Sequence, residues 1–461
     1  LNRLGPSYVK LGQFLATRPD FVGQQVAEAL GRLRDEIEPF GEAAARQVIE
    51  RDLGAPVDSI FSSFSPPIAA ASIAKVHRAE LAGADGAVRP VAVKVLRPGV
   101  RGRFARDLGT FYAGARLVER LDPAMRRLRP VAVVDTIARS ISMEMDLRLE
   151  AAALSEMAER TRGDSGFRVP EVDWQHTSRD VLTLEWIDGI KLSDPAAIEA
   201  AGHDRRRIAR QLMQAFLRHA VRDGFFHADM HQGNLFVDAA GDVVAVDFGI
   251  MGRLGQAERR FLAEILYGFI RRDYLRIAEV HIEAGYVPPH HSPADFAQAL
   301  RAIGEPIHGQ PARDISMAKL LTLLFEVTGL FDMQTRPELI LLQKTMVVVE
   351  GVARSLDPDF DMWTVSEPVV GEWMQRNLGP AGKLAEAAAG LGDLGRAAAG
   401  LPAMLETGAR VAAQLDAATR DGLTLSPETI EAIGRAEGRG NRWLAIGIWV
   451  VAALLVLLLL R

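Results

Sequence analysis

Three separated segments of the chain carry side chains that could bind and activate a polyphosphate. Val91–Lys94 is a strand-like run ending in a lysine, His227–Asn234 is a polar loop, and Asp247 follows an apolar run. A strand lysine can hold the phosphates of ATP, while two acids and an asparagine can orient a hydroxyl and bind Mg²⁺. Asp229 and Asn234 have the required five-residue spacing. We therefore expect a kinase-like ATP site with Asp229 as base or orienting group, and with Asn234 and Asp247 as metal ligands.

The composition is that of a folded protein with several domains. The 461 residues are 48% hydrophobic and 25% charged, which fits roughly two to four domains. A net charge of −5 argues against a broad nucleic-acid-binding surface. The chain has no cysteine, which excludes disulfides, thiolate metal sites and thiol nucleophiles. Only seven of the 54 basic residues are lysines, so Lys94 stands out against an arginine-rich background.

The hydrophobic pattern places the candidate residues on different elements. Residues 1–50 have helical spacing, and short strand-like runs bounded by Pro and Gly follow between residues 60 and 100. The expected hairpin Leu235–Val246 separates the polar loop from Asp247. Because a hairpin returns the chain to its starting edge, the two aspartates and Asn234 can meet at one mouth.

Three further motifs accompany these residues. They are Lys10-Leu11-Gly12-Gln13, Ala69-Ala70-Ala71-Ser72 and Glu144-Met145-Asp146, the last followed by Glu150. They resemble the KxGQ motif, the alanine-rich loop and the ExD motif of the UbiB/ADCK family of atypical protein-kinase-like proteins, and the resemblance covers about residues 1–365. It implies an α+β, protein-kinase-like two-lobed fold with an N-terminal helical KxGQ extension and a C-terminal transmembrane helix. The implied units are the extension, the N-lobe, the C-lobe, an Ala/Gly-rich connector and the anchor, at residues 1–50, 51–188, 189–365, 366–441 and 442–461.

The resemblance also implies how the nucleotide is held. Lys94 would bind the ATP phosphates, with Glu150 as its acidic partner and Glu144 as the competing candidate. Glu185 and Ile187 would form a hinge that contacts adenine through the backbone.

A lid over the site is the second implication. The N-terminal helices would cover the place where an ordinary protein kinase admits a peptide. Lys10 and Gln13 would then reach the phosphates or the acids Glu144 and Asp146, and Ala69–Ser72 would line the nucleotide. The implied activity is ATP binding and hydrolysis, or transfer to a small or lipid-like acceptor, in support of ubiquinone biosynthesis. Phosphorylation of proteins is not expected.

One segment departs from the family pattern. After the alanine-rich serine the family commonly has Ile-Gly-Gln-Val-His, whereas this chain has Ile73-Ala74-Lys75-Val76-His77. Losing the glycine should stiffen the loop. Lys75 either adds a cation near the phosphates or points to solvent, and the sequence leaves both placements open.

The end of the chain suggests a membrane anchor. Residues Trp443–Leu460 carry no charge, and a helix of this length spans about 27 Å, close to the roughly 30 Å of a bilayer core. Arginines 435, 439 and 442 precede the segment and Arg461 follows it. By the positive-inside rule we expect a single-pass protein of the bacterial inner membrane with its main body in the cytoplasm.

Two other functions remain open at this stage. The first is a scaffold that binds nucleotide without turnover and organises ubiquinone biosynthetic enzymes. The second is a small-molecule kinase of the aminoglycoside/choline kinase type, which predicts neither the KxGQ segment nor an anchor. The expected partners are ATP, a membrane lipid or ubiquinone precursor, and the biosynthetic enzymes. The oligomeric state is open.

Overall fold

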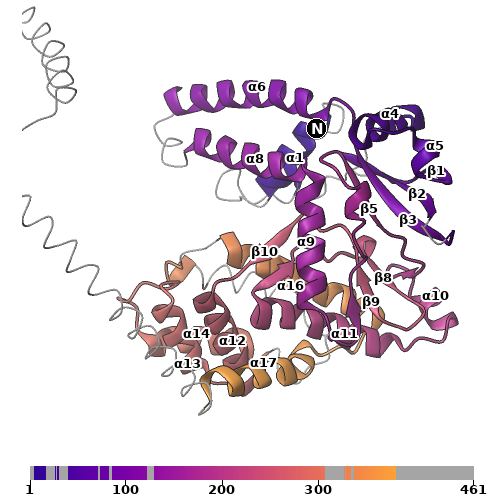
Figure 1. Cartoon of the computed structure of the whole chain (residues 1–461). Helices are drawn as coiled ribbons and strands as arrows, with labels where there is room; N and C mark the ends of the chain where they lie inside the picture. Colours follow the sequence, from indigo (N-terminus) through magenta and orange to yellow (C-terminus); the bar gives the residue numbers. More distant parts are fainter. Residues whose placement is uncertain are drawn as a thin grey trace, which may run out of the picture. The chain divides into compact units, whose positions relative to one another are not determined.

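The computed structural model describes residues 5–16, 26, 29–30, 40–70, 73–82, 86–121, 129–306, 327, 329–333 and 337–379 (Figure 1). The contacts divide the chain into residues 1–378 and 379–461. Most of the expected connector and the whole expected anchor, residues 442–461, lie outside the described residues. Within those ranges no helix is long and apolar enough to cross a membrane.

A four-stranded antiparallel sheet carries Lys94. Its order is β1-β2-β3-β5, with bounds Ser63–Ala70, Ala74–Ala82, Val88–Leu96 and Val181–Glu185. Side chains alternate between the two faces of a strand. Val91, Val93 and Val95 of β3 therefore pack under helices α4 (Glu42–Leu53) and α5 (Val57–Ile60), and Lys94 points to the other face. The expected domain boundary at residue 50 falls inside α4, which packs on this sheet.

A helical hairpin is inserted between Lys94 and its acidic partner. It consists of α6 (Val100–Leu121) and α8 (Pro130–Glu144), and the KxGQ helix α1 (Pro6–Ala16) packs against both (Figure 1). In this contact the Tyr8 ring meets Phe111 edge to face at 5.1 Å. The next helix, α9 (Leu147–Arg160), begins at Asp146, whose side chain caps its first turn.

The C-lobe builds short strands around the expected catalytic loop. Helix α10 (Pro195–Ala200) is followed by α11 (Arg205–Leu217) and a π-helical turn, Arg218–Asp223. The strands form the sheets β4-β9-β8-β6 and β10-β7. Their bounds are Phe167–Arg168 for β4, Ile190–Lys191 for β6, Phe225–His227 for β7, Leu235–Val237 for β8, Val243–Ala245 for β9 and Met251–Arg253 for β10. The predicted hairpin is thus present as β8 and β9. Strand β7 was not predicted, because its pairing with β10 lies outside any local pattern.

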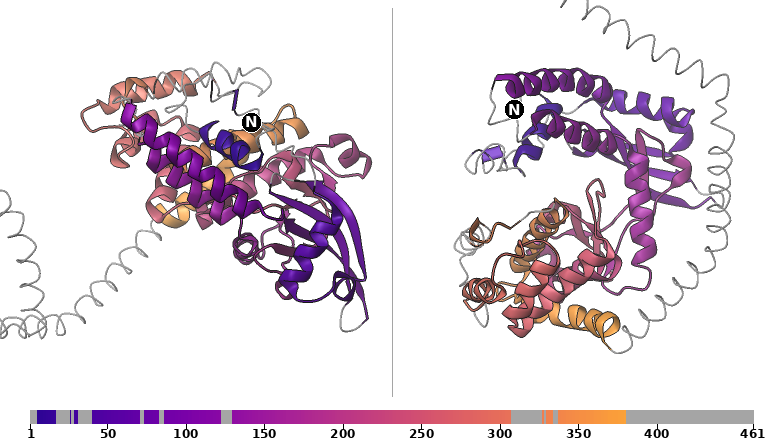
Figure 2. Two further views of the ribbon diagram at one scale, coloured as in Figure 1. Left: turned by 90° about the horizontal axis from the view of Figure 1, so that it is seen from above. Right: turned by 90° about the vertical axis from the view of Figure 1, so that its left-hand side faces the viewer.

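Helices complete the C-lobe. They are α12 (Gln256–Arg271), α13 (Tyr274–Glu283), α14 (Pro293–Gly304), α16 (Pro337–Leu356) and α17 (Met362–Leu378). The right-hand view of Figure 2 shows these helices on one side of the unit and the N-terminal helices α1, α6 and α8 on the other. Helices α16 and α17 pack on α11, and their apolar residues join the large core that surrounds the catalytic loop.

Candidate active site

The two lobes meet at Lys94. Its ammonium lies 2.8 and 3.0 Å from the two carboxylate oxygens of Glu150 on α9, and 3.0 Å from Oδ1 of Asp247. The structure therefore pairs Lys94 with Glu150 and not with the competing Glu144. One lysine joins a strand and a helix of the N-lobe to the end of a C-lobe hairpin. This arrangement fixes a positive charge between two carboxylates at the junction of the lobes.

Burial and the neighbouring charges shift the pKa values of all three groups. Burial acts to raise the pKa of Asp247, but the charge and hydrogen bond of Lys94 outweigh it and leave the pKa at about 2. Burial raises the pKa of the Glu150 carboxyl, against the opposing effect of Lys94. Burial alone would lower the pKa of Lys94, yet the two carboxylates raise it. Asp247 is therefore ionised at neutral pH and can act as a metal ligand.

The backbone at Asp247 is held in an unusual conformation. Its φ of 63° lies in the left-handed region, which is uncommon for a residue with a side chain and costs about 1–3 kcal/mol. His227 lies beside it, fully buried against Phe248 with a ring separation of 4.7 Å. The backbone N–H of Asp229 donates to Nδ1 of His227, so Nε2 carries the proton and donates to the carbonyl of Val246. His227 thus ties the catalytic loop to the residue before Asp247.

The catalytic loop presents Asp229 and Asn234 together. The Asn234 amide donates to the backbone carbonyl of Asp229 over 3.1 Å, which leaves its own amide oxygen to accept or to bind a cation. The backbone N–H of Val246 donates to the Asn234 carbonyl and places Asn234 next to the start of the Asp247 turn. The Asp229 side chain is about 40% exposed and lies 3.7 Å from His231 Nε2. Carboxylate and amide oxygens at Asp247 and Asn234 are the donor types that Mg²⁺ takes.

Two supports of the site were not predicted. Thr345 on α16 is buried, and its hydroxyl lies within hydrogen-bond distance of the carbonyls of Leu341 and Ala228, the latter in the catalytic loop. Arg168 of β4 holds both Glu185 at the hinge and Asp238 in the turn between β8 and β9. The sequence near Thr345 and Arg168 does not indicate these contacts, because each contact joins segments that are distant along the chain.

The predicted hinge segment lies at the end of β5. Glu185 ends β5, and the backbone N–H of Trp186 donates to the carbonyl of Pro90 over 3.2 Å. A contact of Glu185 and Ile187 with adenine stays a prediction.

The KxGQ helix reaches the ExD motif. Lys10 Nζ lies 2.8 Å from Glu144 at the end of α8, and both side chains are about one-sixth exposed. Asp146 instead caps α9 and binds Arg148 through both of its carboxylate oxygens. The side chain of Gln13 lies outside the described part, so its contacts stay a prediction.

The alanine-rich segment is partly strand. Ala69 and Ala70 end β1 and pair with Val76 and Lys75 of β2. Residues 71 and 72 lie outside the described ranges.

Lys75 occupies neither of the two expected places. It is 2% exposed, its ammonium donates to the Phe40 carbonyl, and it lies 4.6 Å from the centre of the Phe40 ring. It shares a strand face with Ala79 and Leu81, which pack under α4. Burial lowers the pKa of Lys75. The face of β2 that bears Lys75 is opposite to the face that bears Lys94 on β3, so Lys75 contacts neither solvent nor the Lys94 cluster.

Comparison with known proteins agrees with this arrangement. The profile of the ABC1 atypical kinase-like domain matches residues 32–281, and that of the UbiB helical domain matches residues 300–361. The chain belongs to the ABC1/UbiB family of atypical kinases. The resemblance inferred from the KxGQ, alanine-rich and ExD motifs is therefore confirmed, as is the protein-kinase-like α+β fold.

Relatives of the family are similar over most of the chain. A protein of Marinobacter nauticus named "Probable protein kinase UbiB" is 42% identical over 387 residues, covering 83% of this chain and 70% of the relative. One of the same name from Xanthomonas campestris pv. campestris is 41% identical over 394 residues, covering 84% and 71%. A Mycobacterium tuberculosis protein solved in complex with erythromycin has a TM-score of 0.57 at 25% identity, covering 78% of this chain and 90% of that one. Membership of this family is consistent with ubiquinone biosynthesis and with a phosphotransferase-class activity.

Proposed function

We propose that this UbiB-family chain binds Mg-ATP at the Lys94 cluster and couples its hydrolysis, or transfer of its phosphate to a small or lipid-like acceptor, to ubiquinone biosynthesis. The observation that carries the proposal is the contact of one lysine with both Glu150 and Asp247. In phosphoryl transfer the lysine must be positioned by the helix acid while the second acid holds the metal. All three groups are already in contact here.

Each residue then has a separate task. Lys94 binds phosphate oxygens, Asp247 and Asn234 hold Mg²⁺, and Asp229 orients the attacking hydroxyl or water. Bound Mg²⁺ would neutralise charge that develops on the phosphates. His227 supports this set by fixing the loop backbone on either side of the site.

The lid explains which acceptors are compatible. Helix α1 is joined to the ExD motif through Lys10 and Glu144, and the family resemblance implies that the N-terminal helices close peptide access. We therefore place a small or lipid-like acceptor at the site in preference to a protein. We also propose that the apolar end of the chain anchors it in the inner membrane, with the main body in the cytoplasm.

Two matched variants test the nucleotide site. Asp247→Asn should abolish Mg²⁺-dependent binding of a fluorescent ATP analogue, whereas Asp229→Asn should bind the analogue normally but lose turnover. Unchanged nucleotide affinity in Asp247→Asn would overturn the assignment. Nucleotide binding with no turnover in the unmodified chain, with or without lipid and a ubiquinone-like phenol, would assign the scaffold function instead.

A further inference from the structure

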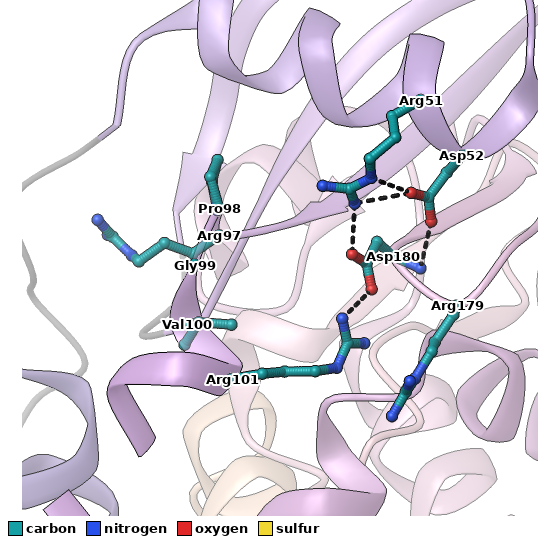
Figure 3. A pocket seen from close by; sticks show the side chains of 9 residues that line it. All are labelled: Arg51, Asp52, Arg97, Pro98, Gly99, Val100, Arg101, Arg179 and Asp180. Atoms are coloured by element: carbon teal, nitrogen blue, oxygen red, sulfur yellow. Dashed lines mark hydrogen bonds and ion pairs between the residues drawn. The ribbon is translucent and has the colours of Figure 1, made fainter. Parts of the chain in front are cut away.

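A cavity of about 370 Å³ lies apart from the Lys94 cluster. It is formed by the end of α4, the turn between β3 and α6, and the residues that lead into β5 (Figure 3). Its lining comprises four arginines, two aspartates and an apolar turn: Arg51, Asp52, Arg97, Pro98, Gly99, Val100, Arg101, Arg179 and Asp180. None of these residues belongs to the candidate active site.

The two aspartates of the lining are already neutralised. Arg51 Nη2 lies 2.7 Å from Asp52 and 2.7 Å from Asp180, and Arg101 binds the other oxygen of Asp180 (Figure 3). The remaining oxygen of Asp52 accepts from the backbone N–H of Asp180 and from the Ser178 hydroxyl. The formal charge of the lining is therefore +2, and its carboxylates are occupied by partners within the wall.

Arg179 and Arg101 retain donors for a ligand. The Arg179 side chain is 58% exposed, and within the described part of the chain its nearest acid is Asp146, with 3.9 Å between Arg179 Nε and Asp146 Oδ2. That separation is too long for a hydrogen bond. The Arg101 side chain is 29% exposed, and its contacts are Nη1 with Asp180 and Nη2 with the Met145 carbonyl. Each of these nitrogens carries a second N–H, and a bound oxyanion is the kind of acceptor that such donors match.

We propose that this cavity binds a phosphate group, with Arg101 and Arg179 as its principal ligands. The planar guanidinium presents paired N–H donors that match phosphate oxygens. The excess charge of the lining also matches a phosphate monoester, which carries roughly −1.5 to −2 at pH 7. The phosphate is carried either by a soluble metabolite or by a lipid headgroup, and both sources share this chemistry.

The position of the two arginines connects the cavity to the active site. Arg101 donates to the carbonyl of Met145, and Arg179 adjoins Asp146. These residues lie between Glu144, which binds Lys10 of the lid helix, and α9, which bears Glu150. A phosphate that draws Arg179 away from Asp146 would therefore act on the turn that joins the lid contact to the catalytic helix. This part of the inference rests on the proposed nucleotide site, whereas phosphate binding itself does not.

Calorimetric titration tests the binding. The full chain in detergent, in EDTA, is titrated with glycerol 3-phosphate. We expect saturable binding to one site, weakened about tenfold to a hundredfold by Arg179→Gln. Arg179→Lys keeps the charge but loses the paired N–H donors of the guanidinium. Its affinity for the phosphate probe should lie between those of the unmodified chain and Arg179→Gln. Arg210→Gln on α11, outside the cavity, is the matched control and should bind like the unmodified chain. No saturable binding of any phosphate probe, or binding that Arg179→Gln leaves unchanged, would overturn the proposal.

A second pair of measurements separates the sources and tests the connection. The same variants are assayed on nanodiscs with and without phosphatidic acid. Loss of binding in Arg179→Gln with both glycerol 3-phosphate and phosphatidic acid establishes the site. Tighter binding of phosphatidic acid assigns the lipid headgroup as the source of the phosphate. The affinity for a fluorescent ATP analogue is then measured with and without the phosphate probe. A change in nucleotide affinity on adding the phosphate probe, seen in the unmodified chain and absent in Arg179→Gln, supports the connection between the cavity and the active site. Phosphate binding with constant nucleotide affinity would refute the connection, and absent nucleotide binding would instead point to a failure of the proposed function.

Discussion

Replacing Lys94 by methionine should destabilise the fold more than the loss of one surface ion pair would suggest. Glu150 is 7% exposed and both of its oxygens bind Lys94. Without the lysine, a carboxylate would be left buried with no cation. Removing one partner of a buried pair costs about 3–5 kcal/mol. We expect a loss of that size in the free energy of unfolding near pH 8.

The pH dependence distinguishes this cause from a packing defect. Burial already raises the pKa of Glu150 above its ordinary 4.5, and the loss of Lys94 removes the main opposing effect. A carboxyl with a raised folded-state pKa stabilises the fold below its unfolded pKa and loses this contribution as the pH rises through the folded value. The penalty of Lys94→Met should therefore be small near pH 5 and largest near pH 8.

A second substitution should restore stability without restoring function. Glu150→Gln alone leaves Lys94 with Asp247 at 3.0 Å and should cost about 1–3 kcal/mol. The double variant removes both charges of the pair, and the one carboxylate that it leaves without Lys94, Asp247, is 43% exposed and open to water. It should therefore recover much of the stability that Lys94→Met loses near pH 8. Neither Lys94→Met nor the double variant should bind nucleotide, since both lack the phosphate-binding cation.

The assay is urea unfolding followed by the fluorescence of the six tryptophans, together with binding of a fluorescent ATP analogue. The double-mutant cycle gives the coupling directly. Strictly additive losses, or a Lys94→Met penalty that is the same at pH 5 and pH 8, would refute the reasoning about a stranded buried charge.

Three other predictions concern separate parts of the chain. Lys10→Ala removes the contact with Glu144 and should change ATP turnover without unfolding the chain; unchanged turnover and nucleotide affinity would show that the helix is not a lid. Burial lowers the pKa of His219 to about 3, so the unfolded state takes up the proton and stability falls as the pH drops below about 6.5. His219→Phe, beside Phe167, should therefore reduce by about 2–3 kcal/mol the stability lost between pH 7 and pH 4.5 in urea unfolding; equal losses in the variant and the unmodified chain would contradict this. Deleting Trp443–Arg461 should move the protein from the membrane to the soluble cell fraction, and retention would reveal a second membrane surface.

The sequence was most informative where chemistry depends on local spacing. Asp229 and Asn234 share one loop, and the hairpin to Asp247 is short, so their convergence could be predicted from the chain alone. The sequence left two candidates for the acidic partner of Lys94, Glu144 and Glu150. The structure decides between them because Asp146 caps a new helix: Glu144 ends α8, and Glu150 lies in the first turn of α9.

The burial of Lys75 could have been predicted from the pattern of its own strand. It alternates with His77, Ala79 and Leu81 along β2, and period-two alternation puts all four side chains on one face. The apolar members of this set indicate a face covered by another element, which α4 supplies. The contact of Thr345 with the catalytic loop carries no comparable signal, because it joins residues 117 positions apart.

The connectivity around Lys94 links the KxGQ helix α1 to the elements that bear Lys94 and Glu150. The hairpin of α6 and α8 is inserted between the strand that bears Lys94 and the helix that bears Glu150. Helix α1 packs on this hairpin and joins its end through the Lys10–Glu144 pair. The Lys10 and Glu144 side chains are only about one-sixth exposed, so the pair is largely shielded from water and couples the position of α1 to the end of α8. Lys94, held by two carboxylates in a buried setting, stays in place. If α1 covers the nucleotide site, as we propose, its movement would reach the turn before α9 through this pair, while Lys94 keeps its position between Glu150 and Asp247.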